Sequence, residues 1–307
     1  MPLHPDLRAL LDATPPEARL DMSSFPLEEG VRRLRSRAAP LINVPGAVPT
    51  EDIRVPGAEG DLPARLYRPA DPRGMVIHFH GGGWVTGTIA QDDFFCQALA
   101  RDAACTVVSL DYRLAPEYAF PKPLDDCFAA TCWASANAER LGGVGAKLAV
   151  SGISAGGNLA AAVTLMARDL GGPKIDFQSL MYPVCDGGMD FPSCQENAEG
   201  YHLTSAAMEW FWQRYAPTPE QRFHPLASVL RAPSLERLPP AVVMTCEFDP
   251  LRDEGNAYAK RLAESGIPVL HRQLPGLIHG FLRMGWNRPW GQQPVAVLAS
   301  ALREAMA

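Results

Sequence analysis

The chain has 307 residues, of which 47% are hydrophobic and 20% are charged, and its net charge is −6. This composition excludes a wholly disordered protein, and a compact chain of this length buries roughly 75% of its extended surface. Without a run of Lys and Arg, binding to nucleic acid through phosphate contacts is not expected. No apolar stretch approaches the ~18 residues of a membrane span. The N-terminus also lacks the basic and apolar pattern of a signal peptide.

The seven cysteines are scattered along the chain, and none forms a Cys-x-x-Cys pair. Their odd number favours free thiols that pack as small core residues in a reducing cytoplasm, so we expect a cytoplasmic protein. No His-Glu-x-x-His motif is present, and we expect neither a metal nor another cofactor. The 26 glycines and 29 prolines are a heavy load of chain-breaking residues for a globular protein.

Residues 1–50 contain two expected short helices, at 3–11 and 27–34, with proline-rich links around them. In the second helix Leu27, Val31 and Leu34 share one face. So short a segment cannot bury much apolar surface by itself, and we expect it to lie across a larger unit. We assign it to the N-terminal helical part of a cap.

From Ile53 the pattern changes to strands. Residues 53–56 and 62–67 alternate like antiparallel strands. Short buried strands then alternate with helices, which predicts an α/β fold with a mostly parallel central sheet flanked by helices. The strands are expected at 75–80, 105–110, 147–151, 177–182, 241–245 and 269–274, and the helices at 94–104, 124–137, 155–170, 257–265 and 294–306.

Between 185 and 240 this alternation breaks down, and an aromatic helix is framed by polar and Pro-rich loops. We interpret 185–240 as a cap insertion over the C-terminal edge of the sheet, partnered by the N-terminal helices. The core is then formed by 51–184 and 241–307. The large side chains Trp84, Trp210, Phe211 and Trp212 are expected to line an apolar pocket beneath the cap; the alternative is that they only pack the cap against the core.

Residues 152–156 (Gly-Ile-Ser-Ala-Gly) fit G-x-S-x-G and join a buried strand to an Ala-rich helix. A sharp turn at this place needs minimal side chains at its flanks, which Gly152 and Gly156 provide. The turn projects the hydroxyl of Ser154 above the sheet, at the positive end of the helix dipole. The alternative is an ordinary strand-to-helix turn whose serine only caps the helix.

Residues 80–84 (His-Gly-Gly-Gly-Trp) directly follow another buried strand. Three consecutive glycines let backbone amides approach a ligand, as in the oxyanion loop of lipases and esterases. Donors fixed there stabilise the negative charge of an acyl-transfer transition state. A phosphate-binding loop is disfavoured because neither nucleotide-binding glycine motif is present. A plain flexible turn is the remaining alternative.

A serine nucleophile needs a base, and the base needs an orienting carboxylate. Of the candidates, His224 lies in the insertion and His271 inside a predicted strand, whereas His279 lies in a loop after the last strand. The acid should follow the preceding strand, where Asp249 lies. Its acidic neighbours, which could be confused with it, are Glu247, Asp253 and Glu254, and the last two more plausibly begin the next helix.

With these motifs the sequence resembles the hormone-sensitive-lipase-like (bacterial type) carboxylesterases of the α/β-hydrolase superfamily. The resemblance runs from about residue 76 to the C-terminus, and the N-terminal helices match in character only. Four motifs agree in order and spacing: 80–84; 111–117 (Asp-Tyr-Arg-Leu-Ala-Pro-Glu); 152–158; and 249–254 with 279–281.

The resemblance implies an α/β-hydrolase fold with a helical cap. It makes Ser154 the nucleophile, His279 the general base and Asp249 its orienting acid. The backbone N–H groups of Gly82, Gly83 and Ala155 resemble the oxyanion donors, and His80 with 111–117 resembles the support of the glycine loop. Where the family usually has Asp or Thr before the nucleophile, this chain has Ile153, which we expect to alter the acyl pocket.

The implied activity is that of a serine carboxylesterase acting on small-molecule esters with short- to medium-chain acyl groups. A receptor on the same fold that binds without turnover is one alternative. An amidase, peptidase or acyltransferase with the same triad is another, because these reactions share nucleophile and oxyanion hole. Related esterases pair through an edge strand, so a homodimer through 269–274 is also expected.

Overall fold

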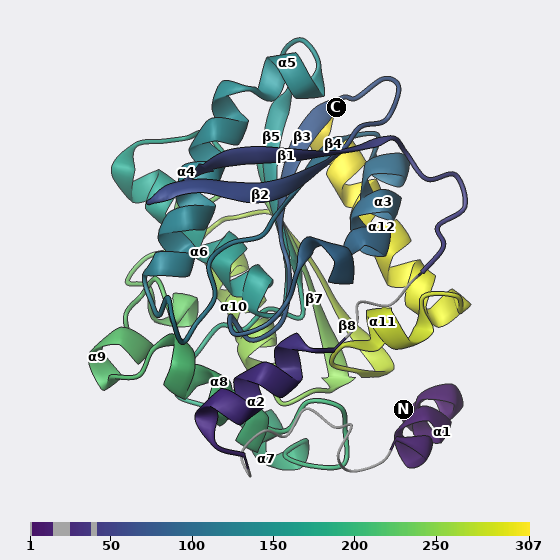
Figure 1. Cartoon of the computed structure of the whole chain (residues 1–307), viewed down its shortest axis with the longest axis vertical. Helices are drawn as coiled ribbons and strands as arrows, with labels where there is room; N and C mark the ends of the chain where they lie inside the picture. Colours follow the sequence, from purple (N-terminus) through teal and green to yellow (C-terminus); the bar gives the residue numbers. More distant parts are fainter. Residues whose placement is uncertain (1, 15–24, 38–41) are drawn as a thin grey trace.

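One sheet runs through the molecule (Figure 1). Within the described residues of the computed structural model (2–14, 25–37 and 42–307), its eight strands lie in the order β1-β2-β4-β3-β5-β6-β7-β8. The pairs β1–β2 and β2–β4 are antiparallel and the other pairs are parallel, which confirms the expected mostly parallel sheet. The strands are β1 (Thr50–Gly57), β2 (Gly60–Tyr67), β3 (Gly74–Phe79), β4 (Thr106–Leu110), β5 (Lys147–Ile153), β6 (Phe177–Met181), β7 (Ala241–Phe248) and β8 (Val269–Ile278).

Helices cover both faces of this sheet, as expected. Val76 of β3 packs into a hydrophobic cluster with the helices α3 and α12, whereas its neighbour Ile77 packs into a second cluster with α4, α6 and α10. Successive side chains of a strand point to opposite faces, so the two clusters are the cores on either side of the sheet. The flanking helices are α3 (Asp93–Ala103), α4 (Lys122–Ala136), α5 (Ala138–Gly142), α6 (Ala155–Leu170), α10 (Arg252–Glu264), α11 (Phe281–Gly285) and α12 (Pro289–Met306).

Several elements are longer than predicted, among them α10, α12 and β8. Helix α10 begins at Arg252 rather than at 257, and α12 begins at Pro289 rather than at 294. Pro289 occupies the first turn of α12, where a missing N–H costs nothing, and Pro294 is accommodated inside the helix. Strand β8 continues to Ile278 rather than ending at 274, because a register shift against β7 and a positive φ of 72° at Gly276 absorb the Pro-Gly interruption.

The segment 185–240 and helix α2 (Leu27–Arg35) lie at the carboxyl ends of the parallel strands, where the arrowheads of β7 and β8 point (Figure 1). Leu34 of α2 belongs to the same hydrophobic cluster as Met208 and Phe211 of the segment. The short helices of the segment are α7 (Pro192–Glu196), α8 (Ser205–Tyr215), α9 (Pro219–Arg222) and the 3₁₀ turn η3 (Val229–Arg231).

Helix α1 (Pro5–Ala13) does not join α2 as the sequence suggested. Its Leu7 belongs to the cluster of α11 and α12, and Asp6 accepts a hydrogen bond from the indole of Trp290 (3.2 Å). Figure 1 shows α1 set apart from α2 and closer to the C-terminal helices. Residues 1, 15–24 and 38–41 of the predicted N-terminal segment lie outside the described residues.

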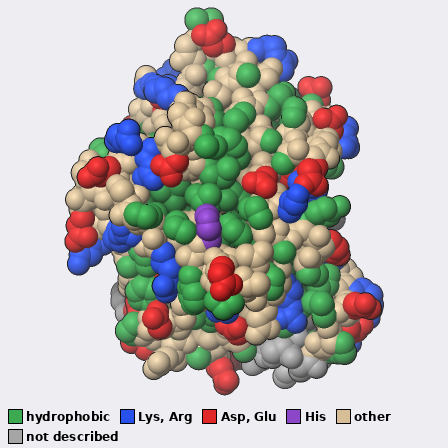
Figure 2. Space-filling model, turned by 90° about the vertical axis from the view of Figure 1, so that its left-hand side faces the viewer, with side chains coloured by type: hydrophobic (Ala, Val, Ile, Leu, Met, Phe, Trp, Pro, Cys, Tyr) green, Lys and Arg blue, Asp and Glu red, His purple; other side chains and the backbone are tan. Residues whose placement is uncertain are grey.

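One pocket of the molecule lies beside the C-terminal part of α6. On the face that carries α6 and α9, apolar side chains gather over a broad area (Figure 2). A pocket of about 360 Å³ opens between the C-terminal part of α6 and residues 224–233.

Among the described helices, none combines the length and the apolar character that crossing a membrane requires.

Candidate active site

The link between β5 and α6 is a sharp, strained turn. Ser154 adopts φ 58° and ψ −118°, a conformation that side chains rarely take and that occurs mostly at functional sites. A Cβ on Gly152 would lie 2.0 Å from the carbonyl oxygen of Gly156, and one on Gly156 would lie 2.0 Å from that of Phe79. The backbone segments therefore approach too closely for any residue but glycine. Ser154 makes no capping hydrogen bond to α6, so its side chain is free for another contact.

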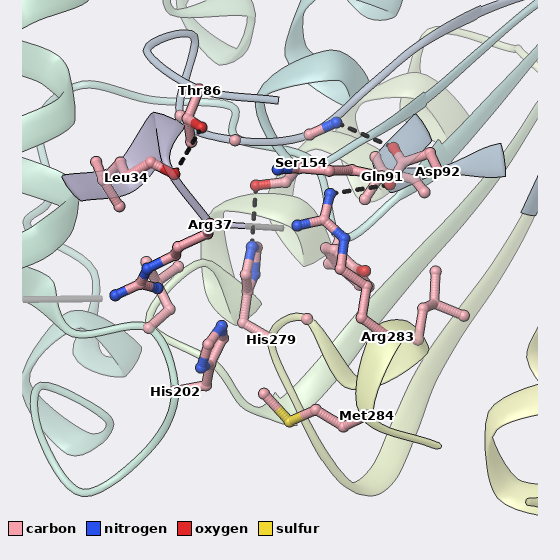
Figure 3. A pocket seen from close by; sticks show the side chains of 18 of the residues that line it. Leu34, Arg37, Thr86, Gln91, Asp92, Ser154, His202, His279, Arg283 and Met284 are labelled. Atoms are coloured by element: carbon pink, nitrogen blue, oxygen red, sulfur yellow. Dashed lines mark hydrogen bonds and ion pairs between the residues drawn. The ribbon is translucent and has the colours of Figure 1, made fainter. Parts of the chain in front are cut away.

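That contact is with His279, which directly follows β8. The Oγ of Ser154 lies 2.9 Å from Nε2 of His279 (Figure 3). Nδ1 of the same ring lies 2.7 Å from Oδ2 of Asp249, directly after β7. The second carboxylate oxygen of Asp249 accepts the N–H of Leu251 (2.9 Å). The exposed fraction of these three residues falls from 8% at the serine to 7% at the histidine and 0% at the aspartate. The structure thus brings together the three residues that the sequence proposed for a triad.

The competing acids and bases lie elsewhere. His271 on β8 contacts Asn256 (3.0 Å). Glu254 lies in the first turn of α10, as expected, but is fully buried, and its Oε1 accepts the N–H of Cys185 (2.7 Å). Burial raises the pKa of Glu254 well above its usual range. It therefore serves the packing of the 185–240 segment rather than the histidine.

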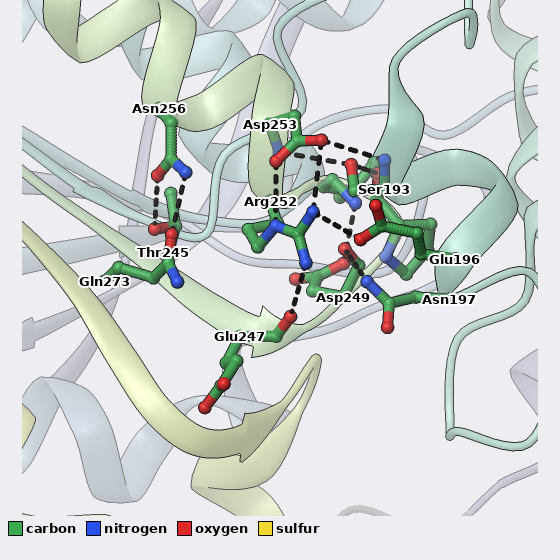
Figure 4. Close-up of polar contacts among 12 residues, drawn as sticks. Ser193, Glu196, Asn197, Thr245, Glu247, Asp249, Arg252, Asp253, Asn256 and Gln273 are labelled. Atoms are coloured by element: carbon green, nitrogen blue, oxygen red, sulfur yellow. Dashed lines mark hydrogen bonds and ion pairs between the residues drawn. The ribbon is translucent and has the colours of Figure 1, made fainter. Parts of the chain in front are cut away.

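Helix α7 of the 185–240 segment holds the loop that carries Asp249 (Figure 4). The amide of Asn197, just after α7, donates to the carbonyl oxygen of Asp249 (3.2 Å). The backbone N–H of Ser193 donates to the carboxylate of Asp253 (2.8 Å), and the hydroxyl of Ser193 donates to the carbonyl of Pro250 (2.8 Å). The acid loop is therefore fixed from the side of the insertion as well as by β7.

The glycine loop after β3 is a tight turn. The carbonyl oxygen of Gly82 accepts the N–H groups of Val85 (3.2 Å) and Thr86 (3.0 Å). Gly82 and Gly83 have φ values of 125° and 59°, and a Cβ on Gly82 would lie 2.2 Å from the carbonyl of Thr86. Within the described part of the chain, no hydrogen bond is recorded from the N–H groups of Gly82, Gly83 or Ala155. These three donors are available to a ligand beside Ser154.

Neighbouring side chains support this loop. The imidazole of His80 contacts the carbonyl oxygen of Gly81 through Nδ1 (2.9 Å), and burial lowers the pKa of His80. Tyr112 stacks on His80 (4.3 Å between ring centroids) and donates to its carbonyl oxygen (2.8 Å). Asp111 accepts the N–H of Ile89 (2.7 Å). Arg113 of the same motif takes no part, because its guanidinium pairs with the buried Asp126.

A pocket of about 320 Å³ opens in front of Ser154 (Figure 3). Of the side chains expected to line it, Ile153 and Phe211 do so. The prediction was wrong for Trp84, Trp210 and Trp212, which are not among its described lining residues. The lining residues are Leu34, Arg37, Gly81, Gly82, Gly83, Thr86, Gln91, Asp92, Phe94, Ile153, Ser154, Tyr182, His202, Leu203, Met208, Phe211, His279, Gly280, Leu282, Arg283 and Met284.

The contacts of α8 explain the error. Met208 and Phe211 face the pocket, whereas Trp212 of the same helix contacts Trp84 in the core. There the fully buried Trp84 stacks on Tyr215 (4.2 Å between ring centroids) and lies 4.7 Å from Trp212. These rings pack the 185–240 segment against the core, which is the alternative that the sequence left open.

Several polar pocket residues carried no signal in the sequence. Burial, together with the neighbouring His279, Arg283 and Arg37, lowers the pKa of His202 to about 3, so this ring is neutral. Tyr182 lies against the ring of His279 (4.6 Å between centroids). His202 and Tyr182 lie in loops and Arg283 lies in α11, none of them within a motif, and only the folded chain places them around Ser154.

Comparison with known proteins agrees with this geometry. A family model described as alpha/beta hydrolase fold matches residues 76–283. An arylesterase of Saccharolobus solfataricus is 37% identical over 305 residues, covering 98% of each chain. A carboxylesterase of Mycobacterium tuberculosis is 36% identical over 314 residues, covering 99% of this chain and 96% of the relative. The solved structure of a hyperthermophilic esterase from the archaeon Pyrobaculum calidifontis matches with a TM-score of 0.88 at 35% identity, covering 100% of both chains.

The structure thus combines a strained turn at the serine, a series of contacts from serine through histidine to aspartate, and a glycine loop with unused donors. The family model for the alpha/beta hydrolase fold matches most of the length of the chain. The chain belongs to the hormone-sensitive-lipase-like family of α/β-hydrolases.

Proposed function

We propose that the protein is a serine carboxylesterase that hydrolyses small esters with short- to medium-chain acyl groups. The observation that carries the proposal is the continuous contact from Ser154 Oγ through His279 to Asp249, at 2.9 and 2.7 Å. These distances are within hydrogen-bond reach of a nucleophile, its base and the group that orients the base. The names of the relatives, an arylesterase and a carboxylesterase, favour esters over amides.

The reaction proceeds in two steps on this geometry. His279 removes the hydroxyl proton of Ser154 through Nε2 while the oxygen attacks the ester carbonyl, and Asp249 stabilises the imidazolium through Nδ1. The imidazolium then gives its proton to the leaving alcohol, and an acyl-enzyme remains on Ser154. Water deprotonated by the same imidazole attacks the acyl-enzyme, and the imidazolium returns the proton to the Oγ of Ser154 as the acid is released.

The developing oxyanion is stabilised by the N–H groups of Gly82, Gly83 and Ala155. Ala155 opens α6, so its donor adds the positive end of a helix dipole. A fixed donor at such a position contributes about 3–4 kcal/mol to the transition state. The pocket beside these donors, about 320 Å³ and lined mainly by apolar side chains, supports acyl groups of modest length.

Ser154→Ala tests the assignment. Hydrolysis of p-nitrophenyl butyrate should fall at least 10³-fold, because the oxyanion hole alone retains only a small part of the acceleration. Ser234→Ala, at an exposed serine, is the matched control and should be unaffected. An organophosphate should label Ser154 in the unaltered protein, which separates an enzyme from a receptor that binds without turnover. Unchanged hydrolysis by Ser154→Ala would overturn the proposal.

A panel of esters and amides separates the remaining alternatives. Matched p-nitrophenyl esters and p-nitroanilides of acetic, butyric, octanoic and lauric acid differ only in the leaving group and the acyl length. We expect turnover of the esters with a maximum at the short to medium chains. Faster turnover of the anilides would indicate an amidase, and transfer of the acyl group to an added alcohol in preference to water would indicate an acyltransferase.

We further propose that 185–240 acts with helix α2 of the N-terminal segment as a cap over a core formed by 51–184 and 241–307, whereas α1 lies outside this cap. Leu34 from α2 and Met208 and Phe211 from α8 form one side of the pocket, which supports this division. Protection of α8 from hydrogen exchange on binding of a phosphonate inhibitor, without a change in α4, would test it. Equal protection of both helices would contradict it.

A homodimer through β8 is proposed as well. Among the described strands β8 lies at the end of the sheet, next to β7; the N–H of His4 occupies its edge at Gly276 (2.9 Å), and the part of the edge over 269–274 is proposed to meet a second copy. Light scattering should give the mass of two chains; a mass of one chain at all concentrations would refute this.

The seven cysteines are free and only Cys132 is exposed, which supports a cytoplasmic protein. Activity found only outside the cell would contradict that location.

A further inference from the structure

A buried carboxylate in the pocket wall joins the two loops that flank Ser154. Oδ2 of Asp92 accepts the N–H of Gly81 (3.2 Å), and its Oδ1 accepts a hydrogen bond from the guanidinium of Arg283 (2.9 Å) (Figure 3). The same Oδ2 lies 3.4 Å from Nε2 of His78. The side chain of Asp92 is 1% exposed. A charge so deeply buried is costly unless it is paired, and here every contact is a donor or a cation.

The contacts of Asp92 belong to different parts of the catalytic machinery. Gly81 is the first residue of the glycine loop, whereas Arg283 lies in α11, the helix that follows His279. The ion pair therefore connects the loop of the oxyanion donors to the loop of the base. Both of its members line the pocket that holds Ser154.

We propose that Asp92 and Arg283 are a pair of positioning residues for ester hydrolysis: Asp92 orients the glycine loop, and Arg283 compensates its negative charge beside the site of the oxyanion. The inference rests on the proposed function and extends it to two residues outside the triad. Neither needs to contact the reacting atoms.

The orienting part follows from the backbone of Gly81. Its N–H is held by Asp92 and its carbonyl oxygen by His80, so both peptide groups around this residue are fixed. A run of three glycines has no side chains that restrain it, and such a chain has more conformational freedom than any other. Polar anchors of this kind are needed to keep the N–H groups of Gly82 and Gly83 directed at one point.

The compensating part follows from charge. Burial opposes ionisation of Asp92, but the positive charge of Arg283 and the hydrogen bond from His78 outweigh it and hold the pKa of Asp92 well below its usual range. The carboxylate is thus ionised while a second negative charge develops on the substrate nearby. Without Arg283 these like charges would repel each other in a poorly solvated pocket, and the transition state would suffer more than the bound ester.

A double-mutant cycle tests the pair. Arg283→Met should lower kcat about 10²-fold with little change in KM, because it leaves the carboxylate uncompensated. Asp92→Asn keeps an oxygen that can accept the N–H of Gly81 and removes the charge, so it should cost less than about 10-fold. The double variant Asp92→Asn/Arg283→Met should be at least 10-fold faster than Arg283→Met alone. Additive losses in the double variant would overturn the inference.

Inhibitor binding separates positioning from a general loss of structure. A trifluoromethyl ketone adds to the serine and forms an oxyanion, so its affinity should fall in Arg283→Met by the same factor as kcat/KM. A corresponding alcohol, which carries no such charge, should bind as to the unaltered protein. Equal weakening of both ligands would show that the pair has only a structural role.

Two controls make the outcomes distinguishable. Arg101→Met breaks an ion pair with Asp102 near the C-terminal end of α3, outside the pocket lining, and should leave kcat unchanged. If Ser154→Ala is inactive and the cycle is additive, the positioning inference alone fails. If Ser154→Ala retains activity, the proposed function fails, whatever the cycle shows.

Discussion

Gly83→Ala is the sharpest test of the glycine loop, because two separate constraints meet at this residue. Its φ of 59° lies in the left-handed region, and a Cβ placed there would be 2.3 Å from Cδ1 of Phe211 on α8. Phe211 is 3% exposed and part of the hydrophobic core, so it cannot simply turn away. The added methyl group must therefore displace the loop, the ring or both.

The magnitude follows from these distances. Carbon atoms pack at about 3.5–4.0 Å, so the clash requires a relative movement of about 1 Å, and the left-handed conformation adds about 1–2 kcal/mol. A misplacement of about 1 Å in a catalytic site can cost 10²-fold, and the loss of one oxyanion donor costs about 10²–10³-fold. We expect kcat of Gly83→Ala to fall by about 10²–10³-fold with a much smaller change in KM.

Steady-state kinetics with p-nitrophenyl butyrate measures this effect, and a second substitution isolates its cause. Phe211→Ala removes the ring atoms that the new methyl group would meet, so Gly83→Ala/Phe211→Ala should recover at least about 10-fold in kcat over Gly83→Ala. Gly171→Ala is the matched control: its φ is 78°, but nothing lies within 4 Å of the added Cβ. It should lower stability slightly and leave kcat intact. A Gly83→Ala protein with normal kcat, or no recovery in the double variant, would refute the clash.

Three further predictions concern stability and the pocket. Burial raises the pKa of Glu254, so the folded state keeps this carboxyl neutral and loses stability as the pH rises above about 4.5, where the unfolded chain ionises. The difference in unfolding free energy between Glu254→Gln and the unaltered protein, measured with urea, should therefore shift in favour of the variant between about pH 5 and 8. A pH-independent difference would contradict this. Trp84→Phe should lose about 1–3 kcal/mol of unfolding free energy by weakening the stack on Tyr215, yet keep the acyl-length profile, since Trp84 is not among the described lining residues; a changed profile would place it in the pocket after all. Ile153→Ala should shift the optimum of a p-nitrophenyl ester series from acetate to laurate toward longer chains, because Ile153 lines the pocket, and an unchanged optimum would exclude it as a determinant of chain length.

The sequence by itself determined the succession of strands and helices along the chain and the residues that could form a triad. Ser154, Asp249 and His279 were predictable because each follows a strand of the parallel part of the sheet, and the carboxyl ends of parallel strands meet at one edge of a sheet. The role of the motif glycines was equally predictable, because a strained turn such as the one at Ser154 excludes side chains at its flanks. These are local requirements of backbone geometry, and they leave a pattern along the chain.

The tertiary structure decided which side chains meet. The aromatic residues of α8 looked alike in the sequence, but the rotation of the helix turns Phe211 into the pocket and Trp212 onto Trp84. Asp92 and Arg283 lie far apart in the chain and carry no motif, and their ion pair exists only because α11 returns to the glycine loop. The periodicity of the sequence indicates which residues share one face of a helix or strand. Which neighbour that face contacts depends on how the whole element is rotated and packed. This rotation and packing are determined by contacts between residues that are distant in the sequence.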